Sequence, residues 1–236
     1  MTEASAGRSD DTLVTCFFKS PPGPDEVGKE VPRTERRVPS PIPQKKFPAV
    51  SVALRLPGRR IVLHGGTSFV LGRQRDCDIV SPQAAKGDDD ARRRLLKVSR
   101  RHCVIFRTDS GWGARDGEGE KRSSFGTWWN GESVFAPLAF GAVPGMLSLG
   151  GPSAVDSVAF DVRTAGMSLL LSLCPDAVET HLLLGGETPL DVVDAHLAGL
   201  SAFFADGVFR WRCGRDQGEF VPGTRMSGVA GDFWVE

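Results

Sequence analysis

The first clear alternation of apolar and polar residues has the period of two that half-buried β-strands show. The apolar side chains of Val52, Leu54 and Leu56 alternate with small or polar ones, and Pro57-Gly58 then turns the chain into the apolar run 61–63. This pattern predicts a β-hairpin that opens a β domain.

Short apolar segments recur after this hairpin, with Gly, Pro or Asn-Gly between them. They lie at residues 69–71, 78–80, 103–106, 112–115, 127–129, 134–135, 146–149 and 158–162. Short strands at this spacing are typical of an antiparallel β-sandwich. We therefore predict an all-β domain over residues 48–165.

Residues 81–97 interrupt this rhythm. Three aspartates at 88–90 precede three arginines at 92–94, so an acidic block is followed by a basic one. Such a segment predicts a long surface loop, with one turn of helix in its second half.

The chain before the first strand has a different composition. Residues 1–47 are rich in Pro and Ser and lack apolar periodicity, so we predict a disordered N-terminal segment. The N-terminus has no apolar stretch typical of a secretion signal, and the longest apolar run, near residues 167–174, is too short to span a bilayer. We expect a cytoplasmic protein without membrane contact.

Composition narrows the functional classes. The 236 residues include 40% hydrophobic residues, enough for a buried core, and 29 basic residues balance 29 acidic ones. No overall field therefore favours nucleic acid, and any anion site must be local. The five cysteines form no C-x-x-C pair, which indicates reduced thiols rather than a zinc site or a disulfide framework.

Four polar motifs punctuate the predicted strands in a particular order. They are Leu71-Gly72-Arg73, Asp78-Ile79-Val80, Val98-Ser99-Arg100-Arg101-His102, and the run from Ser123 to Gly131 with its Gly-Thr and Asn-Gly pairs. With Gly145 to Gly150 as a later strand, residues 50–163 resemble a forkhead-associated (FHA) domain. The resemblance implies an FHA-type β-sandwich that binds phosphothreonine peptides through loops at one end.

The resemblance assigns ligand contacts to hydroxyl and cationic side chains. Arg73 and Arg100 would contact the phosphate or the peptide, and Ser99 and Ser124 would donate hydroxyl groups. These residue types suit a phosphothreonine, which carries nearly two negative charges and three acceptor oxygens. Lys97 would read an acidic residue that follows the phosphothreonine.

Other motif residues are expected to support the site. Gly72 and Asn130 would shape loops, and His102 would hold the binding loops by hydrogen bonds rather than act in catalysis, since no acid stands in a third role. Two positions depart from the family: Phe125 replaces an asparagine that grips the peptide backbone, and a longer loop separates Asp116 from Ser123.

The last segment, 166–236, allows two interpretations. Thr188-Pro189 followed by apolar residues at helical spacing favours a helical extension. Alternatively, residues 184–193 and 197–204 align with 71–80 and 98–105, which favours a second, degenerate FHA-like β domain. In that copy Gly186 and Ala198 replace the phosphate arginine and serine, so it would bind no phosphate in the same way. We favour the second interpretation.

The main hypothesis is a non-enzymatic adaptor without cofactor or metal. It would bind a phosphothreonine-containing protein, a Ser/Thr kinase or its substrate. The alternative is a scaffold that uses the FHA fold for phosphate-independent protein interaction, which Phe125 favours. A third hypothesis, a nucleic-acid binder using the cluster Arg92–Arg101 with Trp128 and Trp129, predicts steep salt dependence.

Overall fold

The computed structural model describes residues 50–81, 87–175, 178–228 and 231–236. The N-terminal segment predicted at residues 1–47 lies outside these ranges. Among the residues that the structure describes, no helix has the length and apolar character needed to cross a bilayer.

Ten of the described strands form one sheet, in the spatial order β18-β19-β1-β2-β13-β12-β11-β10-β7-β8. In chain order they are β1 (Val50–Leu56), β2 (Arg59–Gly65), β7 (Thr127–Trp129), β8 (Glu132–Ser133), β10 (Gly145–Leu149), β11 (Val158–Ala165), β12 (Ser168–Cys174), β13 (Glu179–Leu184), β18 (Arg225–Gly228) and β19 (Gly231–Val235).

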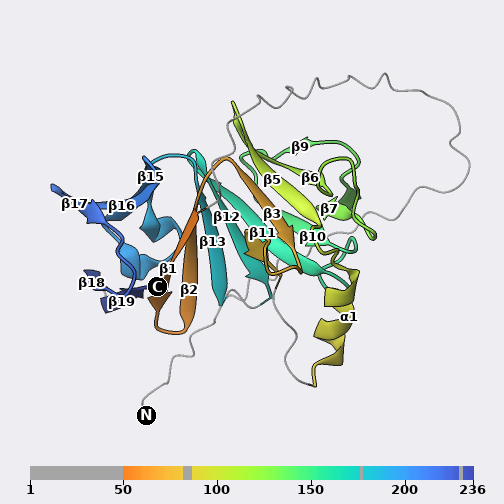
Figure 1. The fold of residues 1–236 in the computed structure, drawn as a ribbon, viewed down its shortest axis with the longest axis horizontal. Coiled ribbons are helices and arrows are strands. Elements are labelled where there is room, and N and C mark those ends of the chain that lie inside the picture. The colour runs from red at the N-terminus through yellow and green to blue at the C-terminus, as the bar shows by residue number, and fades with distance from the viewer. Residues whose placement is uncertain (1–49, 82–86, 176–177, 229–230) are drawn as a thin grey trace, which may run out of the picture. The chain divides into compact units, whose positions relative to one another are not determined.

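Two smaller sheets complete the described fold, as Figure 1 shows. One has the order β4 (Ile79–Val80), β3 (Ser68–Gly72), β5 (Cys103–Thr108), β6 (Gly111–Asp116), β9 (Leu138–Ala139). The other contains β14 (Thr188–Pro189), β15 (Leu200–Ala205), β16 (Val208–Cys213) and β17 (Asp216–Glu219). The predicted all-β fold and the opening hairpin are confirmed.

The large sheet carries a hydrophobic core on each face. On β12, Leu169 and Leu171 belong to a core shared with β3, β5 and β6, whereas Leu170 belongs to a second core shared with β1, β2, β15 and β16. On β13, Leu183 joins the first core and Leu182 the second. Successive side chains of a strand point to opposite faces, so β12 and β13 separate the two cores.

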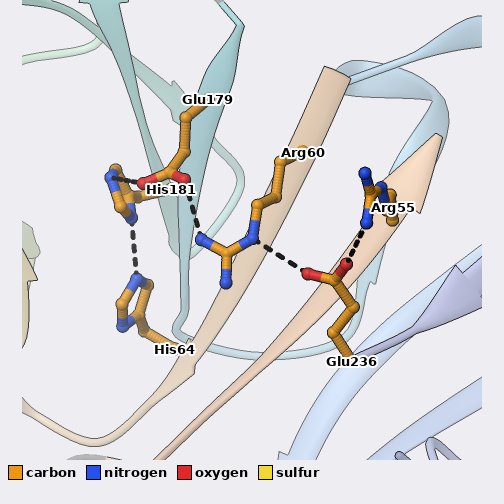
Figure 2. A network of polar contacts seen from close by, with 6 residues as sticks. All are labelled: Arg55, Arg60, His64, Glu179, His181 and Glu236. Atoms are coloured by element: carbon orange, nitrogen blue, oxygen red, sulfur yellow. Dashed lines mark hydrogen bonds and ion pairs between the residues drawn. The ribbon is translucent and has the colours of Figure 1, made fainter. Parts of the chain in front are cut away.

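A parallel pair joins the early and late parts of the chain. Strand β13 pairs with β2 in register, with Glu179 opposite Arg60. Arg60 donates to Glu179 at 2.7 Å and to Glu236 at 3.1 Å, and Arg55 donates to Glu236 at 3.3 Å (Figure 2). These contacts bind β1, β2, β13 and the residue that follows β19 into one polar network.

Two buried histidines extend this network inward. Nε2 of His64 lies 3.0 Å from Nδ1 of His181, whose Nε2 lies 3.3 Å from Glu179 (Figure 2). Burial, together with the neighbouring His181, lowers the pKa of His64 to about 3. The hydrogen bond from His181, with that from Arg60, lowers the pKa of Glu179 to about 2.

The expected boundary at residues 165–166 falls inside the β11–β12 hairpin, where Ala165 pairs with Ser168. The described residues from Val50 onward belong to one compact unit. Strand pairing follows the internal alignment in one part: β15 and β16 pair as an antiparallel hairpin, as β5 and β6 do. It departs in another, because β3 pairs with β4 and β5 whereas β13 pairs with β2 and β12. The second β region therefore has its own core, but β1 and β2 supply one side of it.

The apolar residues that suggested a helix after Thr188 take another form. Two short 3-10 helices, η1 (Leu190–Val192) and η2 (Ala195–Leu197), precede strand β15. Leu190 and Leu197 are fully buried in the second core. The apolar residues therefore have helical spacing because two consecutive 3-10 turns bury them, and not because they lie on one long helix.

The segment predicted as a loop with one helical turn contains a longer helix, α1 (Asp89–Lys97). The side chain of Asp88 accepts a hydrogen bond from the backbone of Ala91 and so caps the helix. Aspartates in the first turn and basic residues in the last turn complement the helix dipole. The acidic and basic blocks thus belong to one helix, although none of its residues is buried.

Candidate functional site

Two of the motifs lie side by side at the end of β3 and the start of β5. The backbone N–H of Arg73 donates to the carbonyl of Ser99 at 3.3 Å, and that of Gln74 donates to Arg100 at 3.1 Å. The N–H of His102 donates to Leu71 at 2.7 Å. The Gly-Arg and Ser-Arg-Arg-His motifs therefore form adjoining loops.

Gly72 is the point of closest approach between these loops. A Cβ atom on Gly72 would overlap with the backbone carbonyl of Arg100. The carbonyl of Gly72 also accepts a hydrogen bond from Ser81 at 2.8 Å. The nearby backbone therefore leaves room only for glycine at this position.

His102 joins three loops from a fully buried position. Its Nδ1 accepts a hydrogen bond from the backbone N–H of Ser99 at 2.8 Å, and its Nε2 lies 2.9 Å from the carbonyl of Gly126. These partners require the proton on Nε2, because a carbonyl only accepts. Burial lowers the pKa of His102 and so favours this neutral ring. The arrangement is that of a supporting residue.

The third motif meets the other two through Ser99. The hydroxyl oxygen of Ser99 accepts a hydrogen bond from the backbone N–H of Ser124 at 3.0 Å. This bond leaves the hydroxyl proton of Ser99 free to donate to an anion. Ser124 is exposed, so two hydroxyl groups stand at the junction of the loops.

The cations around this junction differ in whether their charge is neutralised. Arg73 and Arg100 are exposed, and no described carboxylate lies within ion-pair distance of either. Arg101, by contrast, forms ion pairs with Glu118 and with Asp76. The hydrogen bonds that Arg101 donates to Glu118 raise the pKa of Arg101. Arg73 and Arg100 are therefore the cations of these motifs that remain available to a ligand.

Asp116 is a supporting residue whose role the motifs alone did not indicate. One carboxylate oxygen accepts from the hydroxyl of Ser123 at 2.6 Å and from that of Thr127 at 2.7 Å, and the other accepts from the backbone of Ser123 at 3.2 Å. An acid placed before a loop that ends in Ser and Thr is the available sequence signal. Asp116 fixes both ends of the segment that carries Ser124.

The lengthened loop is held close to the site. Glu118 and Lys121 exchange two backbone hydrogen bonds, and the side chain of Glu118 binds Arg101, the residue after Arg100. A Cβ on Gly117 would overlap with the carbonyl of Lys121, so the turn needs glycine there. The inserted residues thus fold onto the neighbouring loop.

Two predicted residues lie at the edge of this arrangement. Lys97 ends α1 and donates to the backbone carbonyl of Asp156 at 3.0 Å. Asn130 is at the opposite end of β7 from Gly126, where its side chain accepts from the backbone of Met146 at 2.7 Å. Asn130 shapes a hairpin and makes no contact with the three loops among the hydrogen bonds of the described residues.

Phe125 presents an aromatic ring directly before Gly126-Thr127, the position that departs from the resemblance. Its side chain is 54% exposed, and its carbonyl accepts a hydrogen bond from the indole of Trp128 at 3.2 Å. An aromatic ring offers no donor to a peptide backbone. The position therefore supplies apolar contact area instead of an amide.

A cavity of about 560 Å³ lies at the other end of β5, lined in part by Thr67, Arg107 and Phe204. None of the residues predicted to contact a ligand lines it. The candidate site is therefore the loop surface at the start of β5, not this cavity.

Comparison with known families agrees with the placement of the motifs. The family model of the FHA domain matches residues 69–139, which run from β3 to β9 and include all three loops. No curated protein matches the chain.

Proposed function

We propose that the chain is an adaptor that binds phosphothreonine peptides through the loops around Ser99; the match of residues 69–139 to the FHA domain model supports this. FHA domains are in general phosphopeptide-binding interaction modules and not enzymes. For this chain we further propose specificity for phosphothreonine and association with a Ser/Thr kinase.

One observation carries this proposal: un-neutralised cations and hydroxyl groups meet on a rigid support. Arg73 and Arg100 lie on adjoining loops. A hydrogen bond from the backbone of Ser124 to the hydroxyl of Ser99 joins the loop of Ser124 to the loop of Ser99. Guanidinium groups match the planar, bidentate geometry of phosphate oxygens, and hydroxyl groups donate single hydrogen bonds. Buried His102 limits loop movement, which reduces the entropy lost on binding.

The expected energy of each contact sets the size of the mutational effects. A hydrogen bond to a charged group contributes about 1.5–3 kcal/mol, and about 1.4 kcal/mol corresponds to a tenfold change in Kd. Loss of Arg73 or Ser99 should therefore weaken phosphopeptide binding about tenfold or more.

The test is fluorescence anisotropy with peptides selected from a library with a fixed central phosphothreonine. Each selected sequence is compared as threonine, phosphoserine and phosphothreonine, with the wild-type protein, Arg73→Ala and Ser99→Ala. Arg75→Ala is the matched control, because Arg75 is an exposed arginine two residues from Arg73 and has no assigned ligand contact. We expect phosphothreonine to bind best and the control to retain affinity.

Equal binding of the three peptides, or unchanged affinity of Arg73→Ala and Ser99→Ala, would contradict phosphothreonine recognition. The same result would favour the alternative function, a phosphate-independent protein interaction scaffold. The exposed ring of Phe125 supports that alternative. It predicts that Phe125→Ser weakens binding of phosphorylated and unphosphorylated partners to the same degree.

The partner in this proposal is a phosphorylated Ser/Thr kinase or one of its substrates, since such a kinase produces phosphothreonine. We place the adaptor in the cytoplasm. The support for this is that the four cysteines among the described residues are free thiols, as in a reducing compartment.

A further inference from the structure

Helix α1 ends two residues before Ser99. It carries four basic residues against two aspartates in its first turn, so its net charge is positive. Arg92 forms no ion pair with a described carboxylate. Arg94 and Lys97 donate only to the neutral carbonyls of Val155 and Asp156, at 3.5 and 3.0 Å. Arg93 forms an ion pair with Asp90, which also attracts Arg94 without an ion-pair contact.

The C-terminal end of α1 packs against the candidate site, although none of the helix residues is buried. Val98, the residue that follows it, is 1% exposed in the first core, and the next residue is Ser99. The backbone of Lys97 packs against Gly150, whose N–H donates to the carbonyl of Gly126 at 3.0 Å. The basic end of α1 is therefore linked to both loops that hold the hydroxyl groups.

The open face of the helix is amphipathic. Arg92 and Leu96 are four residues apart and so share one face, and the side chain of Leu96 is 65% exposed. A nine-residue helix without buried residues gains little stability from packing. Its surface is thus free for a partner that supplies negative charge beside an apolar residue.

We propose that α1 is a docking surface for an acidic segment adjacent to the phosphothreonine of the bound protein. This inference rests on the proposed function and adds the class of partner: a phosphothreonine flanked by several Asp or Glu residues. Arg92 and Arg94 would attract the acidic side chains while Arg73, Ser99 and Arg100 hold the phosphate.

The geometry favours an acidic peptide over nucleic acid. A single-stranded nucleic acid stacks its bases on open aromatic rings along a basic groove. Trp129 instead packs on Phe140, with ring centroids 4.8 Å apart, and its ring occupies the space beside Gly145. Trp128 donates its indole N–H to Phe125. The basic end of α1 therefore has a phosphate site beside it rather than a row of free stacking platforms.

The experiment uses the full chain and four fluorescein-labelled peptides of equal length in a glycine and serine background. One has a central phosphothreonine with neutral flanks, one has several glutamates before the phosphothreonine, one has them after it, and one is neutral and unphosphorylated. We expect one acidic phosphopeptide to bind about tenfold tighter than the neutral one, as the sum of a few weak exposed ion pairs.

The double variant Arg92→Ser/Arg94→Ser should remove this advantage and leave the affinity for the neutral phosphopeptide unchanged. Arg93→Ser is the matched control, because the charge of Arg93 is already paired with Asp90. The advantage in the wild-type protein should also shrink toward unity as salt is raised, which tests the inference without any substitution.

Equal affinity for acidic and neutral phosphopeptides overturns the inference and leaves the proposed function standing. Equal affinity for the neutral peptide with and without phosphate overturns both. Tighter binding of a single-stranded oligothymidine than of the acidic phosphopeptides, lost in the double variant, would assign α1 to nucleic acid and also overturn the inference.

Discussion

Replacing His64 by glutamine is expected to reduce the pH dependence of stability. His64 is 1% exposed on β2 and lies 3.0 Å from His181. Glutamine keeps an amide that can donate to Nδ1 of His181 but does not titrate. The variant thus removes one buried titrating group and preserves its hydrogen bond.

The size of the effect follows from the two pKa values of His64. The pKa is 6.5 for an exposed histidine and about 3 in the folded protein. Above 6.5 neither state is protonated and the full stability is present; below 6.5 only the unfolded state gains the proton, so stability falls as the pH falls toward 3. At about 1.4 kcal/mol per pH unit, His64 should cost about 2 kcal/mol between about pH 7.5 and pH 5.

The assay is urea unfolding followed by tryptophan fluorescence at both pH values. The lower value stays above 4.5, because the stability that Glu179 contributes through its lowered pKa is lost only below that value. His102 titrates in the same direction in both proteins, so its contribution cancels in the comparison. The loss on acidification should be about 2 kcal/mol smaller in His64→Gln than in the wild type.

Val62→Ala on the same strand is the control for destabilisation without titration, since Val62 is also buried. It should lower stability equally at both pH values. If His64→Gln lost as much stability on acidification as the wild type, His64 would not be held neutral by burial and the reasoning would be refuted.

Three further predictions concern the loops around Ser99 and the ten-stranded sheet, which carries a hydrophobic core on each face. Gly72→Ala should weaken phosphopeptide binding at least tenfold in anisotropy, because its Cβ displaces the carbonyl of Arg100; unchanged affinity would show that the loops adapt. Asp116→Ala should lower the free energy of unfolding by on the order of 3 kcal/mol in urea, by freeing Ser123 and Thr127, and a loss under 1 kcal/mol would contradict the bracing role. A chain cut after Ala165 should lack a cooperative thermal transition in circular dichroism, because it loses β12 and β13; a sharp transition would show that the first core closes without them.

Most strands of the β domain predicted at residues 48–165 could be predicted, because the residue patterns that specify them are local. Alternating residues such as Val52, Leu54 and Leu56 specify a strand and its buried face, and Pro57-Gly58 specifies the turn. The loops that contain Arg73, Ser99 and Ser124 were predictable as a group, since motifs at the ends of neighbouring strands lie close together however the remaining chain folds.

The strand order of the ten-stranded sheet was not predictable from the same signals. An alternation of apolar and polar residues identifies the buried face of a strand, but it does not identify the strand that pairs with it. The sequence signal for this sheet is the pair of unbroken leucine runs at residues 169–171 and 182–184, which is typical of strands covered on both faces. Continuous apolar runs of this kind would have placed β12 and β13 between two cores. The bracing by Asp116 depends on side-chain geometry across a loop, which spacing does not specify.

The shared sheet also bears on how the chain reaches its fold. Arg55 on β1 contacts Glu236, 181 residues later, and Arg60 on β2 contacts Glu179, 119 residues later. Closing such long loops costs entropy before any contact forms, so folding should be slow for a protein of this size. Until β13 and β19 arrive, both edges of the β1–β2 hairpin remain open, and unpaired edges invite pairing between chains. Aggregation, and the need for chaperones, should therefore be greatest for folding intermediates in which the β1–β2 hairpin has not yet paired with β13 and β19.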